Sequence, residues 1–282
     1  MSQMRALLNL SVAVLIALPA FAAIERPLIV TTQDHSLVDA DDCVNFHTQN
    51  TTSLPSLAQS EEERRIGLAG INLLKVRTGN EGGVSIKGWD RPFARLTVCK
   101  SAVALSDAQA RSTLRQINVA IANGEIVANG PALDETQTWW VHMILRVPRK
   151  ANVDITSLNG GIAVRNMNGS VTARARNGGI SLAGCAGVNN IRTENGGISL
   201  DKITGQLDAT TQNGPISLKL RDDATPSIDA QTDDTGEILC HLKTCAAGNG
   251  NWTADRKHLR IGSSPSIRLT SYNADIMIEH VR

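Results

Sequence analysis

The sequence predicts an all-β protein that folds as a β-solenoid, a stack of coils similar to a parallel β-helix, with 18-residue coils and one short helix. Three observations indicate this fold. An Asn-Gly-Gly-Ile or Asn-Gly-Pro-Ile motif recurs at a step of 18 residues, a second glycine recurs at the same step, and apolar residues alternate with polar ones between them. The motif begins at Asn159, Asn177, Asn195 and Asn213. A fixed step of this length is typical of repeat proteins, in which each unit stacks on the one before it.

Equivalent positions of the four repeats form columns of one residue type. The clearest column follows the turn and holds Ile162, Ile180, Ile198 and Ile216. Period-two alternation indicates strands with one buried face, so each isoleucine is expected to stack on the next. An Asn-Gly pair between alternating runs is also typical of a β-hairpin, which makes a meander of hairpins the alternative. The identity of residues down the columns favours the solenoid.

The Asn-Gly pairs are interpreted as structural turns. The pairs are Asn159-Gly160, Asn177-Gly178, Asn195-Gly196 and Asn213-Gly214. Glycine and asparagine tolerate the positive φ that a sharp turn needs, and a column of asparagines can hydrogen-bond along the stack. The alternative is that the four asparagines contact a ligand or a metal, but polar turn residues usually serve the turn itself.

Residues 1–22 are typical of a secretory signal peptide. An early Arg5 precedes an apolar run, Ala6–Leu18, and small residues occupy the positions that a signal peptidase reads. A membrane anchor is the alternative, but the run is shorter than the roughly 20 residues of a spanning helix. We therefore expect an exported protein, in the periplasm or at the surface of a bacterium, that does not span the membrane after signal removal.

The rest of the chain divides into two predicted parts. Residues 23–66 are predicted to form a polar N-terminal arm or linker, with the charge run Glu61–Arg65 as a solvated face. Residues 67–282 are predicted to form the β-solenoid domain. Within it, Ser106 and Gln109 form a capping-box pattern that predicts a helix to about Gln116.

Incomplete copies of the repeat occur on both sides of the four regular ones. Residues 74–86 are a degenerate early copy, and residues 228–239 resume the pattern after an irregular turn. Residues 267–278 repeat it once more and are followed by polar residues. We expect this last copy to cap the stack, because an open sheet edge invites aggregation.

Five cysteines occur in a chain that is expected to be exported, where disulfides are permitted. Cys240 and Cys245 can close a small loop, and Cys43 with Cys99 is the natural remaining pair, which would tie the N-terminal arm to the body. Cys185 is left over. A metal site is the alternative, but the spacing is poor for zinc, and the pairing cannot be proved from sequence.

A family resemblance adds to this interpretation. Gly88-Trp89-Asp90 precedes a strand, an Ala-containing helix precedes Ile117, a strand ends at Arg146-Val147-Pro148, and the Asn-Gly-Gly-Ile motifs follow. In this order they resemble the putative-adhesin domain of unknown function of bacterial exported proteins, over about residues 74–281. The resemblance implies an all-β repeat fold and export. It implies no reaction and supplies no functional residues.

The sequence favours a non-enzymatic structural or adhesion module at the cell envelope, without a cofactor. The formal charge falls from +1 to 0 when Arg5 is removed with the signal peptide, which argues against nucleic acid as a partner. The six histidines are scattered and have no metal-site spacing. The alternative is a polysaccharide-acting enzyme on a β-helix scaffold. Its candidate acids lie in turns, where solvated acids are common: Asp222, Asp223, Asp233 and Asp234.

One column of small residues is a candidate interaction strip for an envelope or surface partner, protein or glycan. The strip consists of Ala163, Ser181, Ser199 and Ser217. Neighbours on a strand face opposite sides, so these residues point away from the isoleucine column. Long charged side chains normally cover an exposed sheet, and their absence suggests a contact surface. The alternative is that serine is merely tolerated on a solvated strand.

Overall fold

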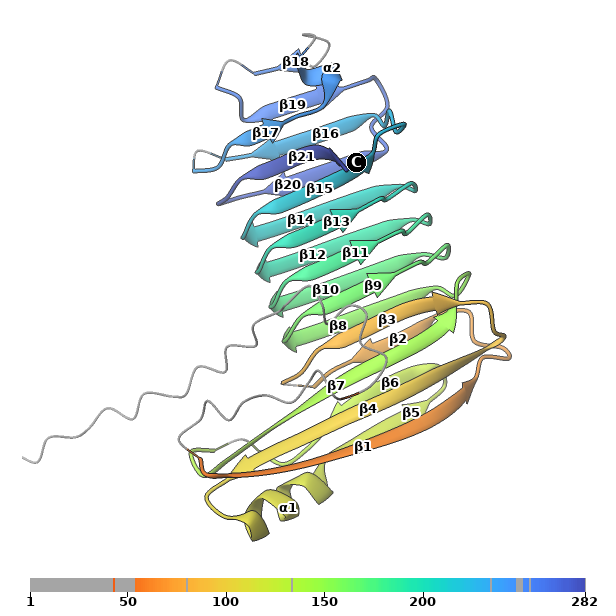
Figure 1. Cartoon of the computed structure of the whole chain (residues 1–282), viewed down its shortest axis with the longest axis vertical. Helices are drawn as coiled ribbons and strands as arrows, with labels where there is room; N and C mark the ends of the chain where they lie inside the picture. The colour runs from red at the N-terminus through yellow and green to blue at the C-terminus, as the bar shows by residue number, and fades with distance from the viewer. Residues whose placement is uncertain are drawn as a thin grey trace, which may run out of the picture.

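The computed structural model describes residues 43, 54–79, 81–132, 134–233, 235–246, 251–253 and 255–281. The predicted signal peptide and most of the predicted N-terminal arm lie outside the described residues. The described part is all-β with two short helices, which confirms the predicted class (Figure 1). No helix within it is long and apolar enough to cross a membrane.

The strands form two mixed sheets, with one predicted and one unpredicted helix beside them. Sheet A has ten strands in the spatial order β1 (Ser56–Gly67), β4 (Phe93–Ala104), β7 (Gln137–Pro148), β3 (Val84–Trp89), β9 (Ile162–Arg165), β11 (Ile180–Ala183), β13 (Ile198–Asp201), β15 (Ile216–Arg221), β21 (Ile276–Val281) and β17 (Ile238–Cys240). Sheet B has eleven in the order β18 (Asn251–Trp252), β19 (His258–Ile261), β16 (Ile228–Thr232), β20 (Ile267–Ser271), β14 (Leu207–Asn213), β12 (Asn189–Asn195), β10 (Val171–Asn177), β8 (Val153–Asn159), β2 (Leu74–Arg77), β6 (Glu125–Asn129) and β5 (Asn118–Ala122). The helices are α1 (Asp107–Gln116) and α2 (Lys243–Ala246).

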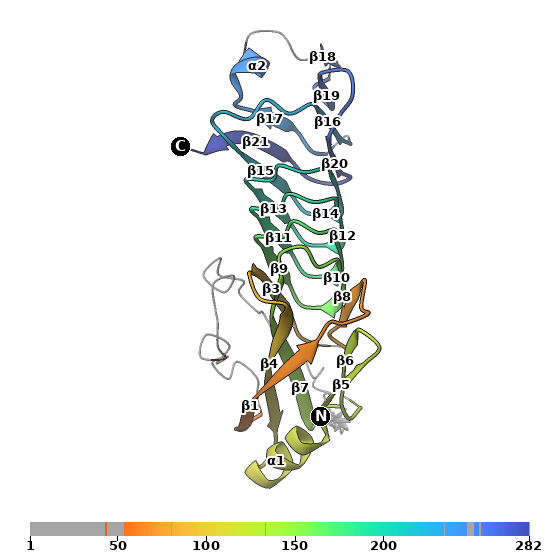
Figure 2. The ribbon, with the colours of Figure 1, turned by 90° about the vertical axis from the view of Figure 1, so that its right-hand side faces the viewer.

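Each 18-residue repeat contributes one strand to each sheet. The strands β8, β10, β12 and β14 pair in parallel in sheet B, and β9, β11, β13 and β15 do so in sheet A. Ile180 lies between Ile162 and Ile198 in register, so the predicted column exists. Figure 2 shows the two sheets facing each other, and the isoleucines between them are at most 2% exposed. The core is therefore a stack of similar layers that burial of apolar surface holds together.

The spatial order of the layers differs from the chain order at both ends. The strand pair β2–β3 lies between β6–β7 and β8–β9, although β6–β7 comes later in the chain. The pair β20–β21 lies between β14–β15 and β16–β17 in the same way. The expectation that residues 267–278 cap the stack is therefore wrong, because β20–β21 lies inside the stack although it comes last in the chain. The antiparallel pair β18–β19 lies at that edge of sheet B instead.

The other end is closed by elements that the repeat does not predict. Strand β1 pairs antiparallel with β4 along twelve residues, in part of the chain expected to be a polar arm. Alternate residues of its charge run turn inward, where Glu62 pairs with Arg64 at 2.7 Å and with Lys100 at 3.2 Å. Ion pairing thus lets a strand form where hydropathy indicates a linker. The predicted helix is confirmed as α1, and Ser106 Oγ accepts a hydrogen bond from the Gln109 amide.

The turn glycines are required by close stacking more than by positive φ. A Cβ on Gly196 would lie 2.3 Å from the carbonyl oxygen of Gly178 in the next repeat, and one on Gly178 would lie 2.3 Å from that of Gly160. Gly160 and Gly214 have positive φ values of 153° and 159°, which L side chains rarely adopt, whereas none of the four motif asparagines has a positive φ. The expected positive φ is thus present at two of the four motif glycines and at none of the asparagines, while close stacking requires glycine at all four.

Positive φ occurs at a different column, after the sheet A strands. Asn166, Gly184 and Lys202 have φ of 55°, 59° and 52°, again 18 residues apart. This column makes the left-handed bend that returns the chain to sheet B. Asn166 and Gly184 are residue types that favour a left-handed bend, and they could have predicted this column. Lys202 does not favour such a bend, so the 18-residue recurrence was not apparent from the sequence.

Both expected disulfides are present. Cys43 is bonded to Cys99 on β4, and Cys240 is bonded to Cys245 on α2. Cys185 is free and buried in the core, and burial raises the pKa of its thiol. A buried, protonated thiol behaves as a small apolar side chain.

Candidate interaction surface

The predicted strip lies on the outer face of sheet A, with its residues side by side. Ala163, Ser181, Ser199 and Ser217 are register partners on β9, β11, β13 and β15. Each is half-buried, whereas the flanking Ile and Leu or Val side chains point into the core. Period-two alternation thus places one small side chain of each repeat on the same outer surface.

A groove of about 690 Å³ follows this strip. Its floor contains the four strip residues and Ser85 of β3. One wall is made by the turn residues Gly161, Gly179, Gly197 and Pro215, and the other contains Arg165, Asp201 and Lys219. Because the floor and the first wall carry almost no side-chain bulk, main-chain atoms lie near the surface. A flat ligand can therefore approach the backbone closely over several repeats.

The corner next to the groove is an asparagine ladder. Asn177, Asn195, Asn213 and Asn273 each donate an Nδ2 hydrogen bond to Oδ1 of the asparagine one layer below, at 2.7, 2.8, 2.8 and 2.5 Å. The lowest asparagine, Asn159, donates to Glu81 Oε1 at 3.0 Å. The side-chain amides of these asparagines thus hydrogen-bond to other residues of the protein. This supports the structural interpretation of the turns.

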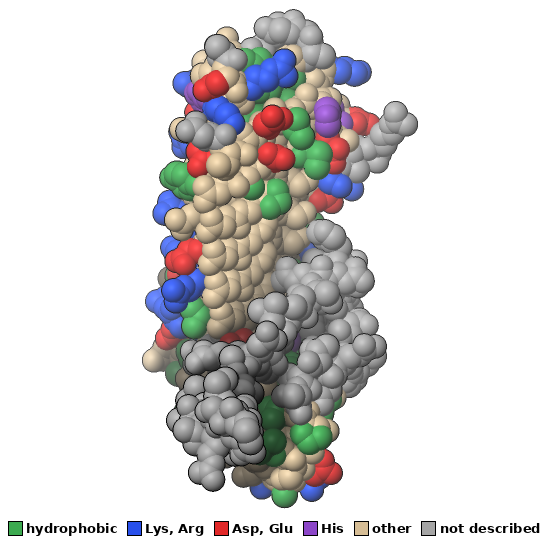
Figure 3. All heavy atoms as spheres, turned by 90° about the vertical axis from the view of Figure 1, so that its left-hand side faces the viewer, with side chains coloured by type: hydrophobic (Ala, Val, Ile, Leu, Met, Phe, Trp, Pro, Cys, Tyr) green, Lys and Arg blue, Asp and Glu red, His purple; other side chains and the backbone are tan. Residues whose placement is uncertain are grey.

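The end of the ladder carries a carboxylate. Burial raises the pKa of Glu81, and its hydrogen bond from Asn159 opposes that shift. All the ladder amides donate in the same direction, so their positive ends point toward Glu81. Figure 3 views the molecule from the side where the sheet B strands of the repeats end, and a continuous uncharged area follows the stacked turns.

The second wall of the groove is charged but mixed in sign. Arg165, Asp201 and Lys219 lie in one register row, with Ala183 between the first two. Lys219 pairs with Glu279 at 3.5 Å. Asp201 Oδ1 is buried and accepts no hydrogen bond from the described residues. The wall therefore places charges of both signs beside the strip.

A Ser–His pair lies at one end of the groove, and sequence analysis did not find it. Ser85 Oγ and His142 Nε2 are 3.0 Å apart, although the residues are 57 positions apart in the chain. Burial lowers the pKa of His142 to about 3. A histidine with such a pKa is neutral at pH 7 and is a poor general base there, because an effective base has a pKa near the working pH. The pair therefore serves to satisfy a half-buried imidazole.

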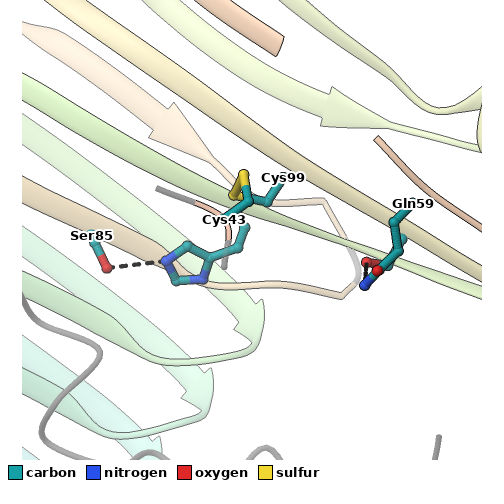
Figure 4. The surroundings of a disulfide bond; sticks show 6 residues. Cys43, Gln59, Ser85 and Cys99 are labelled. Atoms are coloured by element: carbon teal, nitrogen blue, oxygen red, sulfur yellow. Dashed lines mark hydrogen bonds between the residues drawn. A yellow bond between two sulfur atoms is a disulfide. The ribbon is translucent and has the colours of Figure 1, made fainter. Parts of the chain in front are cut away.

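The strip row continues past this pair toward the Cys43–Cys99 disulfide. Ser85, Ile144 and Thr97 extend the row over β3, β7 and β4, and they are 5–6% exposed although they point outward. Figure 4 shows Ser85 near the disulfide. Cys99 and His142 are register partners, so the disulfide joins the N-terminal part of the chain to this end of the groove.

The turn acids predicted as an alternative site do not converge. Asp223 pairs with Arg221 at 2.9 Å, and this hydrogen bond lowers the pKa of Asp223. Asp233 Oδ1 accepts from the amide and hydroxyl of Thr235. Asp222 is exposed, and Asp234 lies outside the described residues. Within the described ranges, no group of three His, Cys, Asp or Glu residues could hold a metal ion.

No protein-family model and no curated protein matches this chain. Among solved structures, it is similar to a putative cell adhesion protein from Clostridium sporogenes, with a TM-score of 0.46 and 12% identity over 79% of this chain and 100% of the other. It is also similar to a putative adhesin from Bacteroides fragilis, with a TM-score of 0.37 and 11% identity over 80% and 100% of the two chains. A putative lipid binding protein from Parabacteroides distasonis has a TM-score of 0.25 and 10% identity over 81% and 99%.

The first two descriptions agree with the putative-adhesin resemblance that the sequence indicates. All three TM-scores are below 0.5, so these structures do not identify a function for this chain.

Proposed function

We propose that the protein is a non-enzymatic, exported β-solenoid that acts as an adhesion or interaction module at the bacterial cell envelope. Its binding surface is the groove over Ala163, Ser181, Ser199 and Ser217. The partner is an envelope or surface molecule, protein or glycan, with a flat face that fits a strip of small side chains.

The observation that carries this proposal is the groove itself. Four register-matched small residues form its floor over four consecutive strands. A solvated sheet face is normally covered by long charged side chains, as on the outer face of sheet B, where Arg174 pairs with Asp154 at 2.9 Å.

The solenoid assignment is supported by strand pairing. Each of the four regular repeats adds one parallel strand to both sheets at an 18-residue step. A meander of hairpins would pair these strands antiparallel. Residues 67–282 are proposed as the solenoid domain, with β1 as an added edge strand that begins within the predicted arm.

Export is supported by cysteine usage. The two disulfides are typical of an oxidising compartment such as the periplasm or the cell surface. The predicted signal peptide, residues 1–22, accounts for this location.

The polysaccharide-acting alternative would need a pair of carboxylates facing the groove, about 5–9.5 Å apart. Of the described residues that line it, Asp201 is the one with a carboxylate, and the same wall carries Arg165 and Lys219. This arrangement favours binding over glycoside cleavage.

The experiment is a pair of arginine substitutions in the strip, Ser181→Arg with Ser199→Arg. The two arginines fill the groove, so capture of partners from envelope extract and any self-association seen by light scattering are expected to be lost. The melting temperature should change little, because both side chains point to solvent.

The matched control places arginines on adjacent strands of the opposite sheet, Thr172→Arg with Asn190→Arg, which are also register partners. This variant should bind as the unmodified protein does. Equal binding by the strip variant and the unmodified protein would show that the strip is ordinary surface.

A further inference from the structure

Aromatic and basic side chains meet at the hairpin that joins β3 to β4. Because β3 runs parallel to β9, this hairpin lies on the side of the stack opposite the asparagine ladder, the side that Figure 2 views. The rings of Trp89 and Phe93 pack edge to face, with their centroids 5.0 Å apart. Trp89 Nε1 donates a hydrogen bond to the carbonyl oxygen of Phe93 at 2.9 Å. The two ends of the hairpin are therefore held together.

Each of these rings has an arginine over it. Arg65 Cζ lies 3.8 Å from the ring centroid of Phe93, and Arg95 Cζ lies 5.6 Å from that of Trp89. A guanidinium group is attracted to an aromatic face at such distances, and its N–H donors remain at its edge. The Phe93 ring thus positions Arg65 without using the donors that would bind an anion.

The carboxylates of Glu63 and Asp90 are already paired with other arginines. Glu63 lies 3.6 Å from Arg95, and Asp90 lies 2.9 Å from Arg149. Arg65 is the register partner of Arg95, and like charges directly opposite each other destabilise a sheet. Arg65 therefore stands beside a second positive charge and forms no ion pair with a carboxylate of the described residues.

Arg91 adds a second cation at the tip of the hairpin. It lies between Asp90 and Pro92 and is exposed, as is Arg65. Like Arg65, it forms no ion pair with the part of the chain that the structure describes. Two guanidinium groups on one hairpin and its neighbouring strand are therefore open to an anion from solution.

The rings themselves do not form an apolar docking surface. Trp89 and Phe93 are half-buried and pack against each other. An apolar partner would have to displace the guanidinium groups of Arg65 and Arg95 from the ring faces. The cluster thus presents hydrogen-bond donors and positive charge.

We propose that Arg65 and Arg91 bind a phosphate monoester group at the β3–β4 hairpin, in a site separate from the strip. Their two charges match a phosphate monoester, which carries about −1.5 to −2 at pH 7. The fork of N–H donors on a guanidinium group also fits the oxygens of phosphate. Sheet A runs in the order β1, β4, β7, β3, β9, so Arg65 on β1 is four strands from the first strip residue. The proposal therefore stands independently of the proposed function.

Phenylglyoxal, which modifies accessible arginines, tests the site in the unmodified protein. Inorganic phosphate should slow the modification of Arg65 and Arg91, measured by peptide mapping. Arg111 and Arg115 are exposed on α1 and serve as internal controls whose modification should not slow. Equal slowing of all four arginines, or none at Arg65 and Arg91, would overturn the proposal.

A binding measurement by calorimetry at low ionic strength uses Arg65→Gln with Arg91→Gln. Glucose 6-phosphate should bind this variant roughly tenfold or more weakly than the unmodified protein, because two hydrogen-bonding charges are lost. The matched control, Arg111→Gln with Arg115→Gln, removes the same charge and should leave the affinity unchanged. An equal loss in both variants would show a general charge effect and contradict the site.

Phe93→Leu tests the positioning of Arg65 without changing the charge. The affinity for glucose 6-phosphate should fall about threefold, the effect of one exposed cation–π contact. The thermal unfolding curve of the same variant shows that it is folded. An unchanged affinity would contradict the role of the ring.

Further probes identify the source of the phosphate group. Vesicles that contain phosphatidic acid present a phosphate monoester as a lipid headgroup, whereas glucose 6-phosphate presents it on a soluble sugar. Binding of either probe that depends on Arg65 and Arg91 supports the site and assigns its source. Glucuronate carries a single charge and should bind more weakly than glucose 6-phosphate. Equal binding of glucuronate, or binding of none of these probes, would overturn the assignment to phosphate.

Discussion

Asn195 donates a hydrogen bond from Nδ2 to Oδ1 of Asn177 at 2.8 Å, across two layers of the stack. The same asparagine accepts one from Asn213 at 2.8 Å. Each ladder asparagine thus joins the layer below to the layer above, outside the hydrophobic core. The ladder fixes register at the corner, because a shift of one residue would break every bond in it.

Asn195→Ala removes two ladder bonds at an exposed corner. The free energy of unfolding should fall by about 1 kcal/mol, the typical net contribution of hydrogen bonds that water can replace. Asn168→Ala is the matched control, since Asn168 is exposed and outside the ladder. Chemical denaturation checks both variants, and equal midpoints would show that the ladder contributes nothing.

Gly196→Ala tests the close stacking of the turns. The added Cβ would lie 2.3 Å from the carbonyl oxygen of Gly178, so the two layers must separate. A loss of about 3 kcal/mol is expected, typical of overpacking at a rigid site. Gly67→Ala is the control, because a Cβ there would meet no atom of a non-neighbouring residue within 4 Å. Equal melting temperatures for the two variants would show that close stacking does not require glycine at position 196.

Lys202→Gly should stabilise the protein. Lys202 is exposed and has a φ of 52°, a left-handed conformation that glycine adopts without steric cost. The expected gain is up to about 1 kcal/mol, because the unfolded glycine is also more flexible. Lys75→Gly, in the strand β2, should instead lower stability. Thermal unfolding compares the two, and a loss at Lys202 would contradict the assignment of the bend.

His142 makes stability depend on pH. Its folded pKa of about 3 lies below the ordinary value of 6.5, so the unfolded chain binds the proton more readily between these values. Its contribution to stability is therefore complete above pH 6.5 and is lost as pH falls toward 3. The slope can reach about 1.4 kcal/mol per pH unit.

The measurement for His142 compares the unmodified protein with His142→Gln between pH 6.5 and 4.5, above the range in which ordinary carboxylates dominate. The difference in unfolding free energy should narrow as pH falls. Parallel curves would show that His142 is not desolvated.

The regular part of the fold could be predicted because a single 18-residue step sets the register of all four repeats. The 18-residue spacing places Ile180 on Ile198 and Ser181 on Ser199, and the structure has both pairs. The groove floor follows from the same register. Both predictions depend on columns, which a single sequence displays directly.

The layer order at the ends could not be predicted. Ile267 and Ile228 both fit the column that contains Leu207, so either strand could pack next to the fourth repeat. The structure places Ile267 next to Leu207 and Ile228 beyond it. The local sequence pattern carries no information on which of two equivalent strands pairs with β14.

The Ser85–His142 contact and the strand β1 were missed for a similar reason. Both depend on pairing between distant segments, β3 with β7 and β1 with β4. The charge run in β1 also conceals its inward face, because Glu62 and Arg64 neutralise each other there. Hydrophobic periodicity does not report a face that ion pairs satisfy.

The central claim is that consecutive repeats lie in register and bring the strip residues together. Oxidation of Ser181→Cys with Ser199→Cys tests it most directly, since adjacent strands place these Cα atoms about 5 Å apart, within reach of a disulfide. This pair should form a disulfide in the folded protein, whereas Ser181→Cys with Ser217→Cys, two layers apart at about 10 Å, should not. Mass spectrometry after oxidation gives the result. Disulfide formation in both variants, or only in the second, would contradict the stack and the strip built on it.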